Sequence, residues 1–102
     1  MRPAEGEGTV MQTAFEDATT TTAIPLPQPG SSGDELLRMG LMYSTGQGGA
    51  PLDYVSAHML FNLAAMRGSE EAKQYRRELS AEMDRDSVNE AQRAAREWLQ
   101  RA

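Results

Sequence analysis

His58 is the only histidine in this sequence, so any catalytic base or metal site that needs an imidazole would have to be built around it. An imidazole can act as acid, base or metal ligand near neutral pH because its pKa is about 6.5. The neighbours Ala57 and Met59 belong to a predicted helix, where a histidine bonded to backbone or water is the commoner arrangement. A small hydrolase or ligand-binding protein that uses His58 is therefore the less favoured alternative.

Two other groups of residues could do chemistry. The segment Gly46-Gln47-Gly48-Gly49 is similar to a phosphate-binding loop, but it follows a predicted helix and lacks the Lys-Ser/Thr pair that grips phosphate and magnesium. The carboxylates Glu70-Glu71 and Asp84 stand at predicted helix starts, where capping and the helix dipole explain them. We therefore expect no enzyme, and we predict no catalytic, cofactor-binding or metal-binding residue.

Composition excludes further classes of protein. There is no cysteine, which rules out disulfides and thiolate zinc sites. Four of the 15 acidic residues and one of the ten basic residues precede residue 34. The arginines that follow are interleaved with carboxylates, so we expect a solvated mixed-charge surface and no nucleic-acid binding. No apolar run is long enough to span a membrane and no apolar leader segment is visible, so we expect a cytoplasmic location.

A first helix is predicted from residue 34 onward. Ser32 and Glu35 have the spacing of a capping box, and Gly46 marks the end of the helix. Gly40 costs about 1 kcal/mol relative to alanine, which is tolerable if its missing side chain lets a neighbouring helix approach closely. The apolar face has three- and four-residue spacing. It consists of Leu36, Leu37, Gly40, Leu41 and Tyr43.

A second helix is predicted between Asp53, a good N-cap, and Gly68, a residue suited to the left-handed conformation that ends helices. Its apolar residues also recur at three- and four-residue intervals. They are Ala57, Leu60, Phe61, Ala64 and Ala65. The two helices would pack as an antiparallel pair.

The segment from Met39 to Gly68 resembles the Sel-one-like repeat family, a branch of the tetratricopeptide-like α-solenoids. The residues that carry the resemblance are Met39-Gly40, Tyr43, Gly46-Gln47-Gly48, Asp53-Tyr54, Ala57, Ala64-Ala65 and Gly68. The resemblance implies an all-α fold of stacked αα-hairpins whose first helices line a binding surface. It also implies that this protein holds other molecules.

Two more helices are predicted after the repeat, which would span residues 34–68. Ser69 is the expected N-cap of the third and Asp84 of the fourth, and together these capping helices would cover residues 69–101. On the fourth helix, Trp98 is interpreted as an anchor for the cap, as in the terminal helix of bacterial relatives that this one resembles. The pairs Arg93–Glu97 and Glu97–Arg101 would give weak ion pairs on the solvent side.

Residues 1–33 differ in composition from the rest. They are rich in proline and threonine, carry a net negative charge and contain few large apolar groups, so we expect a disordered tail. Val10, Met11 and Phe15 are followed by Glu16-Asp17. These residues could form a short motif that orders on binding.

The candidate partner-binding residues come from the first two helices. Met59, Leu63 and Met66 form a second apolar stripe on the second helix, which either the third helix or a partner would cover. The first helix adds Arg38 and Met42. We therefore expect a non-catalytic protein-interaction module or small accessory subunit, able to self-associate. The alternative is a structural subunit of a larger complex, a membrane-bound one included.

Overall fold

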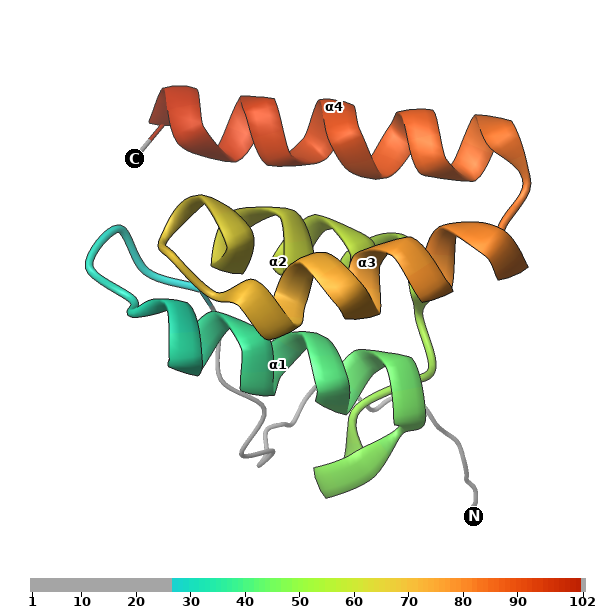
Figure 1. Cartoon of the computed structure of the whole chain (residues 1–102), viewed down its shortest axis with the longest axis horizontal. Helices are drawn as coiled ribbons and strands as arrows, with labels where there is room; N and C mark the ends of the chain where they lie inside the picture. Colours follow the sequence, from blue (N-terminus) through green and yellow to red (C-terminus); the bar gives the residue numbers. More distant parts are fainter. Residues whose placement is uncertain (1–26, 102) are drawn as a thin grey trace, which may run out of the picture.

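The computed structural model describes residues 27–101, and these form four α-helices and one short 3-10 helix (Figure 1). The elements are α1 (Gly33–Thr45), η2 (Gln47–Gly49), α2 (Tyr54–Met66), α3 (Glu70–Glu82) and α4 (Arg85–Arg101). The described range contains no strand, which confirms the predicted all-α class. The proposed motif at Val10, Met11 and Phe15 lies outside the described residues.

The helices begin at the predicted capping residues. Ser32 forms both bonds of a capping box, at 3.1 and 2.8 Å. The Asp53 carboxylate and the Ser69 hydroxyl each accept a backbone N–H of the following helix at 3.1 Å. A hydrogen bond from the Ser87 side chain holds the pKa of Asp84, which precedes α4, below its usual value. Local sequence therefore determines where each helix starts.

Glycines turn the chain between α1 and α2. Gly46 ends α1 in the left-handed conformation, with φ of 76°, and its N–H donates to the Met42 carbonyl at 2.7 Å. The chain then returns to α1, where the Asp53 N–H donates to the Tyr43 carbonyl at 2.9 Å. The second bond closes the loop, so the start of α2 is tied to the end of α1.

Successive helices run in opposite directions, and α1 and α4 lie at opposite edges of the molecule (Figure 1). The central helix is α2, which packs against α1, α3 and α4. This position explains why α2 is apolar almost all round. The core contains Leu36, Leu37, Met39, Ala57, Leu60, Phe61, Leu63, Ala64, Ala72, Leu79 and Ala95.

Gly40 permits the close contact between α1 and α2. A Cβ at this position would lie 2.6 and 2.7 Å from two atoms of the Phe61 ring. Phe61 is 1% exposed and stacks on Tyr75 of α3, with ring centroids 5.6 Å apart. The predicted close approach at Gly40 is therefore confirmed.

Residues just before α1 contact the helical part of the molecule. The Arg67 guanidinium, beyond the end of α2, donates to the carbonyls of Pro29 and Ser31 at 2.8 and 2.9 Å. Residues 27–32, which we expected to belong to the disordered tail, are therefore held against the helices, and α1 starts at Gly33.

The ion pairs predicted on α4 are not formed. Within residues 27–101, the one pair of opposite charges closer than 4.0 Å is Lys73 with Glu70, at 3.2 Å. Glu97 is bonded to neither Arg93 nor Arg101. Exposed pairs of this kind gain only a few tenths of a kcal/mol, which does not offset the entropy of fixing two long side chains.

Candidate interaction surface

Helix α4 lies along the second apolar stripe of α2, since Met59 and Met66 each line a pocket with residues of α4. Leu63, in the middle of the stripe, is 2% exposed and belongs to the core with Ala95 of α4. Leu63 is therefore not available to a partner, which corrects its inclusion among the binding residues. Met59 is half-buried, whereas Met66 is 63% exposed. The stripe thus divides into a buried centre and two accessible flanks.

The α1 candidates lie apart from those of α2. Arg38 is exposed and Met42 is half-buried. The Met42 methyl group lies 2.8 Å from the position that a Cβ of Gly48 would take, so this side chain packs over the loop after α1. Met59 and Met66 each line a pocket with residues of α4, and neither pocket includes Arg38 or Met42.

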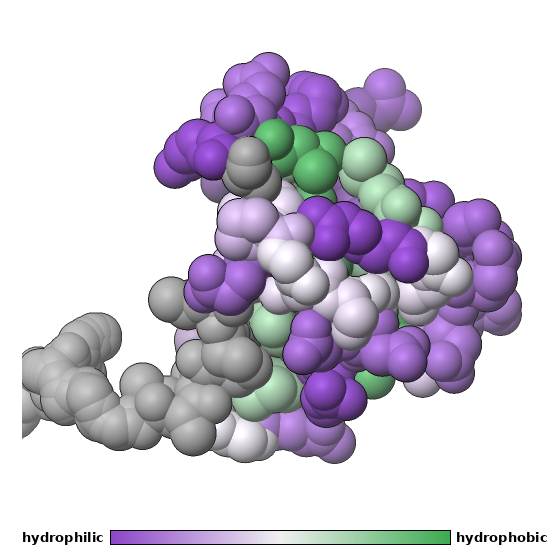
Figure 2. Space-filling view, turned by 90° about the vertical axis from the view of Figure 1, so that its left-hand side faces the viewer, coloured by the Kyte–Doolittle hydropathy of each residue, from purple (hydrophilic) through white to green (hydrophobic). Residues whose placement is uncertain are grey.

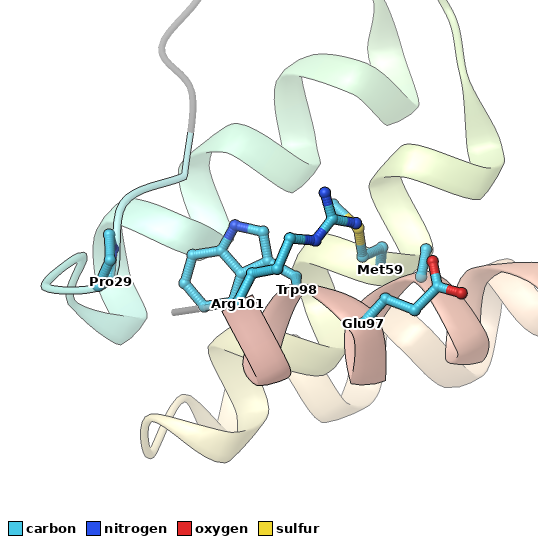
Figure 3. Close-up of a pocket in the computed structure, with 6 residues that line it drawn as sticks. Pro29, Met59, Glu97, Trp98 and Arg101 are labelled. Atoms are coloured by element: carbon cyan, nitrogen blue, oxygen red, sulfur yellow. The ribbon is translucent and has the colours of Figure 1, made fainter.

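Two grooves follow the sides of α4. We call the first the Met66 groove; it has a volume of about 230 Å³ and is lined by Asn62, Met66, Gln92, Ala95, Arg96 and Leu99. The second, the Trp98 groove, has a volume of about 400 Å³ and is lined by Pro29, Met59, Ala94, Glu97, Trp98 and Arg101 (Figure 3). Each groove combines methionine with apolar side chains of α4 and an arginine, and the Trp98 groove also contains the carboxylate of Glu97. The Met66 groove, which has no acidic lining residue, could therefore hold an apolar group beside a carboxylate.

The end of the molecule near the α2–α3 turn shows how the apolar groups are distributed. Figure 2 shows a small group of hydrophobic residues near the top of this face, bordered by hydrophilic ones. An apolar patch with a polar border is typical of a site that contacts another protein segment.

Sequence reasoning missed the contribution of α4 to these grooves. We interpreted Trp98 as a cap anchor, and it does pack partly against the core. However, it also lines a groove, as does its neighbour Leu99 on the other side of the helix. The signal was present in the adjacent apolar pairs Ala94-Ala95 and Trp98-Leu99, because a single buried seam needs only one residue of each pair.

His58 belongs to a hydrogen-bonded chain between α2 and α3. Its Nε2 lies 2.8 Å from Ser80 Oγ, and its Nδ1 lies 3.4 Å from Asn62 Nδ2. Arg76 donates to Asn62 Oδ1 at 2.7 Å. Arginine can only donate, so Asn62 must present its amide N–H to His58 Nδ1. Nδ1 then accepts, and the ring proton on Nε2 is donated to Ser80.

This tautomer is the reverse of what nucleophilic catalysis requires. A histidine that activates a serine accepts the serine proton, whereas His58 donates to Ser80. The ring is 1% exposed, and its burial, followed by the positive charge of Arg76, lowers the pKa of His58. Neutral His58 therefore links α2 to α3, and the geometry lends no support to a hydrolase built around it.

A second exposed apolar surface lies at the other end of α2. Leu52 is 65% exposed and Tyr54 is 38% exposed. They line a cavity of about 440 Å³ together with three carboxylates, those of Asp53, Glu82 and Asp84. Asp53 and Asp84 are accounted for as helix caps, and Glu82 ends α3.

Within residues 27–101, the acidic side chains and His58 form no cluster of three or more that could bind a metal ion. Across the same residues, no helix has the length and hydrophobicity needed to cross a bilayer.

Comparison of the chain with models of protein families, with characterised proteins and with solved structures gives no match. The resemblance to Sel-one-like repeats therefore stays a prediction from the residues between Met39 and Gly68.

Proposed function

We propose that this chain is a non-catalytic protein-interaction module that binds a helix or peptide of a partner protein in the Met66 groove. The observation that carries the proposal is the 63% exposure of Met66 beside Leu99 and Arg96. Covering a large exposed apolar side chain beside a groove removes its surface from water, which stabilises the complex with the partner.

The chemistry of the groove favours one kind of partner segment. Among the described residues that line the groove, Arg96 is the charged one. It lies beside the apolar side chains of Met66, Ala95 and Leu99. A segment with apolar side chains and a nearby carboxylate would therefore be complementary. Met66 suits such a contact because its flexible, polarisable side chain adapts to irregular surfaces.

The proposal includes the architecture from which the surface is built. We infer that α1 and α2 form one αα-hairpin of the tetratricopeptide-like solenoid kind, and that α3 and α4 cap it by each packing against α2. The central position of α2 and the alternating helix directions support this inference. Short stacks gain stability from neighbours, which is a further reason to expect a partner or a second copy beside them.

Photochemical crosslinking in the cell that makes the protein tests the proposed surface. The photoreactive residue p-benzoylphenylalanine replaces Met66 in one variant and Leu52 in the control, since Leu52 has nearly the same exposure at the other end of α2. We expect an adduct of defined mass from position 66 and none from position 52. Arg96→Glu should lower its yield about tenfold, because like charges would then oppose each other.

Three outcomes would contradict this proposal: no adduct from position 66, equal adducts from both positions, or a yield that Arg96→Glu leaves unchanged. An adduct with twice the mass of the chain would show self-association in place of a separate partner.

A further inference from the structure

The Trp98 groove has the features of a binding site for an apolar segment with a charged group beside it. Met59, Ala94 and the Trp98 indole are its apolar lining groups. The side chain of Arg101 also lines it (Figure 3). Glu97 also lines the groove, and neither Glu97 nor Arg101 forms an ion pair with another described residue. The groove is larger than the Met66 groove and lies on the opposite side of α4.

The residues that precede α1 lie beside this groove. Pro29 lines it, and the bonds from Arg67 to the carbonyls of Pro29 and Ser31 fix where the preceding residues emerge. A second pair of bonds joins Gln28 to Ser31, N–H to carbonyl at 3.0 Å and N–H to hydroxyl at 2.9 Å. Whatever precedes residue 28 is therefore tethered beside Trp98.

One segment of the preceding sequence matches the groove. Val10, Met11 and Phe15 are apolar, and Glu16-Asp17 follow at once. Ile24 and Leu26 are closer to the groove along the chain, but they alternate with prolines and have no adjacent carboxylate. Residues 18–28 can span at most about 36–40 Å, which exceeds the 24 and 30 Å shorter dimensions of the molecule.

We propose that the segment 10–17 binds in the Trp98 groove of its own molecule. Phe15 fills the space between Met59 and Trp98, and the carboxylates of Glu16 and Asp17 face Arg101. Tethering makes the effective concentration of the segment millimolar, so a contact too weak to form between separate molecules is populated. The groove is then closed to other ligands until a competitor displaces the segment.

Trp98 is the only tryptophan in the chain, so its fluorescence reports on this groove in the full-length protein. We expect Phe15→Ser to shift the Trp98 emission to longer wavelength and to raise its quenching by acrylamide. Loss of one buried aromatic side chain should reduce the ratio of molecules with the segment bound to molecules with the segment released at least about tenfold. The matched control is Ile24→Ser, which removes an apolar residue from the same part of the chain and should change neither quantity.

Charge reversal gives a second, independent measurement. Arg101→Glu should also expose Trp98, and the combination with Glu16→Lys and Asp17→Lys should restore its protection. Circular dichroism of each variant checks that the helices are unchanged. A synthetic peptide of residues 8–19 should protect Trp98 in the Phe15→Ser variant.

The proposal is overturned if Phe15→Ser leaves Trp98 emission and quenching at the wild-type values, or if Ile24→Ser has the same effect. It is also overturned if the protection of Trp98 disappears on dilution, because the segment would then occupy a second molecule. The Met66 groove takes no part in this experiment, so either proposal can fail without the other.

Discussion

Single side chains in this protein have roles set by what surrounds them. His58 and Met66 lie on the same helix, yet the imidazole is 1% exposed and hydrogen bonded at both nitrogens, whereas the methionine is 63% exposed. Residue type alone would have favoured the opposite assignment, with a histidine at the surface and a methionine in the core.

The buried imidazole makes the stability of the protein depend on pH. The pKa of His58 in the folded protein lies below the usual 6.5, because burial and then the Arg76 charge disfavour the protonated ring. As the pH falls through 6.5, the unfolded chain takes up a proton that the folded protein still excludes. The free energy of unfolding therefore decreases, by up to about 1.4 kcal/mol per pH unit, until the lower folded pKa is passed.

Two measurements check this prediction. The proton NMR signals of the single imidazole should titrate with a midpoint below 6.5. Urea unfolding should show a smaller loss of stability between pH 7.5 and pH 5.5 in His58→Gln than in the wild-type protein, since glutamine does not titrate. A midpoint at or above 6.5 would show that the ring is open to solvent.

At the scale of elements, each helix has its own start signal, but the distance between helices depends on individual contacts. The separation of α1 and α2 is set where the backbone of Gly40 meets the ring of Phe61. Phe61 in turn stacks on Tyr75, so the same contact connects α1 to α3 through α2.

Gly40→Ala should therefore destabilise the protein even though alanine is the better helix former. Replacing a glycine inside a helix gains about 1 kcal/mol, whereas forcing a methyl group into a packed site costs about 1–3 kcal/mol. We expect a net loss of up to about 2 kcal/mol, because the Cβ would lie 2.6 Å from a buried ring. Urea unfolding followed by circular dichroism measures it.

The control for this substitution is Arg38→Ala on the exposed face of α1, which should change the free energy of unfolding by less than about 0.5 kcal/mol. Phe61→Leu should remove most of the extra cost of the added methyl group, so the double variant should be less unstable than the sum of its parts. If Gly40→Ala stabilises the protein, the contact between α1 and α2 is looser than described.

At the scale of the whole molecule, α2 is the helix on which the other three converge. One apolar stripe of this helix has both a buried and an exposed part: Leu63 lies in the core, and Met66, about one turn later, is exposed. The same helix therefore serves both stability and the proposed partner surface.

Truncating Leu63 and truncating Met66 should have different effects on the stability of the fold. Leu63→Ala should cost about 2–5 kcal/mol, because it leaves a cavity beneath α4. Since 1 kcal/mol shifts the melting temperature of a domain of this size by about 4–8 °C, melting should fall by about 10 °C or more. Met66→Ala should shift melting by no more than a few degrees. Equal losses from both would mean that Met66 is also buried.

Much of the fold could be predicted because its signals are local. The caps at Ser32, Asp53 and Ser69 act within one helical turn, and the spacing of apolar residues shows which face of each helix is buried. The candidate surface could be predicted only in part. Met66 is exposed, but Leu63 is buried, and the grooves also depend on α4 residues that we had interpreted as a cap.

By itself, the sequence determined the helical class, the four helix starts and the close approach at Gly40, since each depends on residues near one another in the chain or on the absence of a side chain. Only the tertiary structure decided that Leu63 is buried in the core, that His58 is hydrogen bonded to Ser80 and that Pro29 lies beside Trp98. These contacts join residues far apart in the sequence, and periodicity within one helix carries no information about which neighbour will cover it.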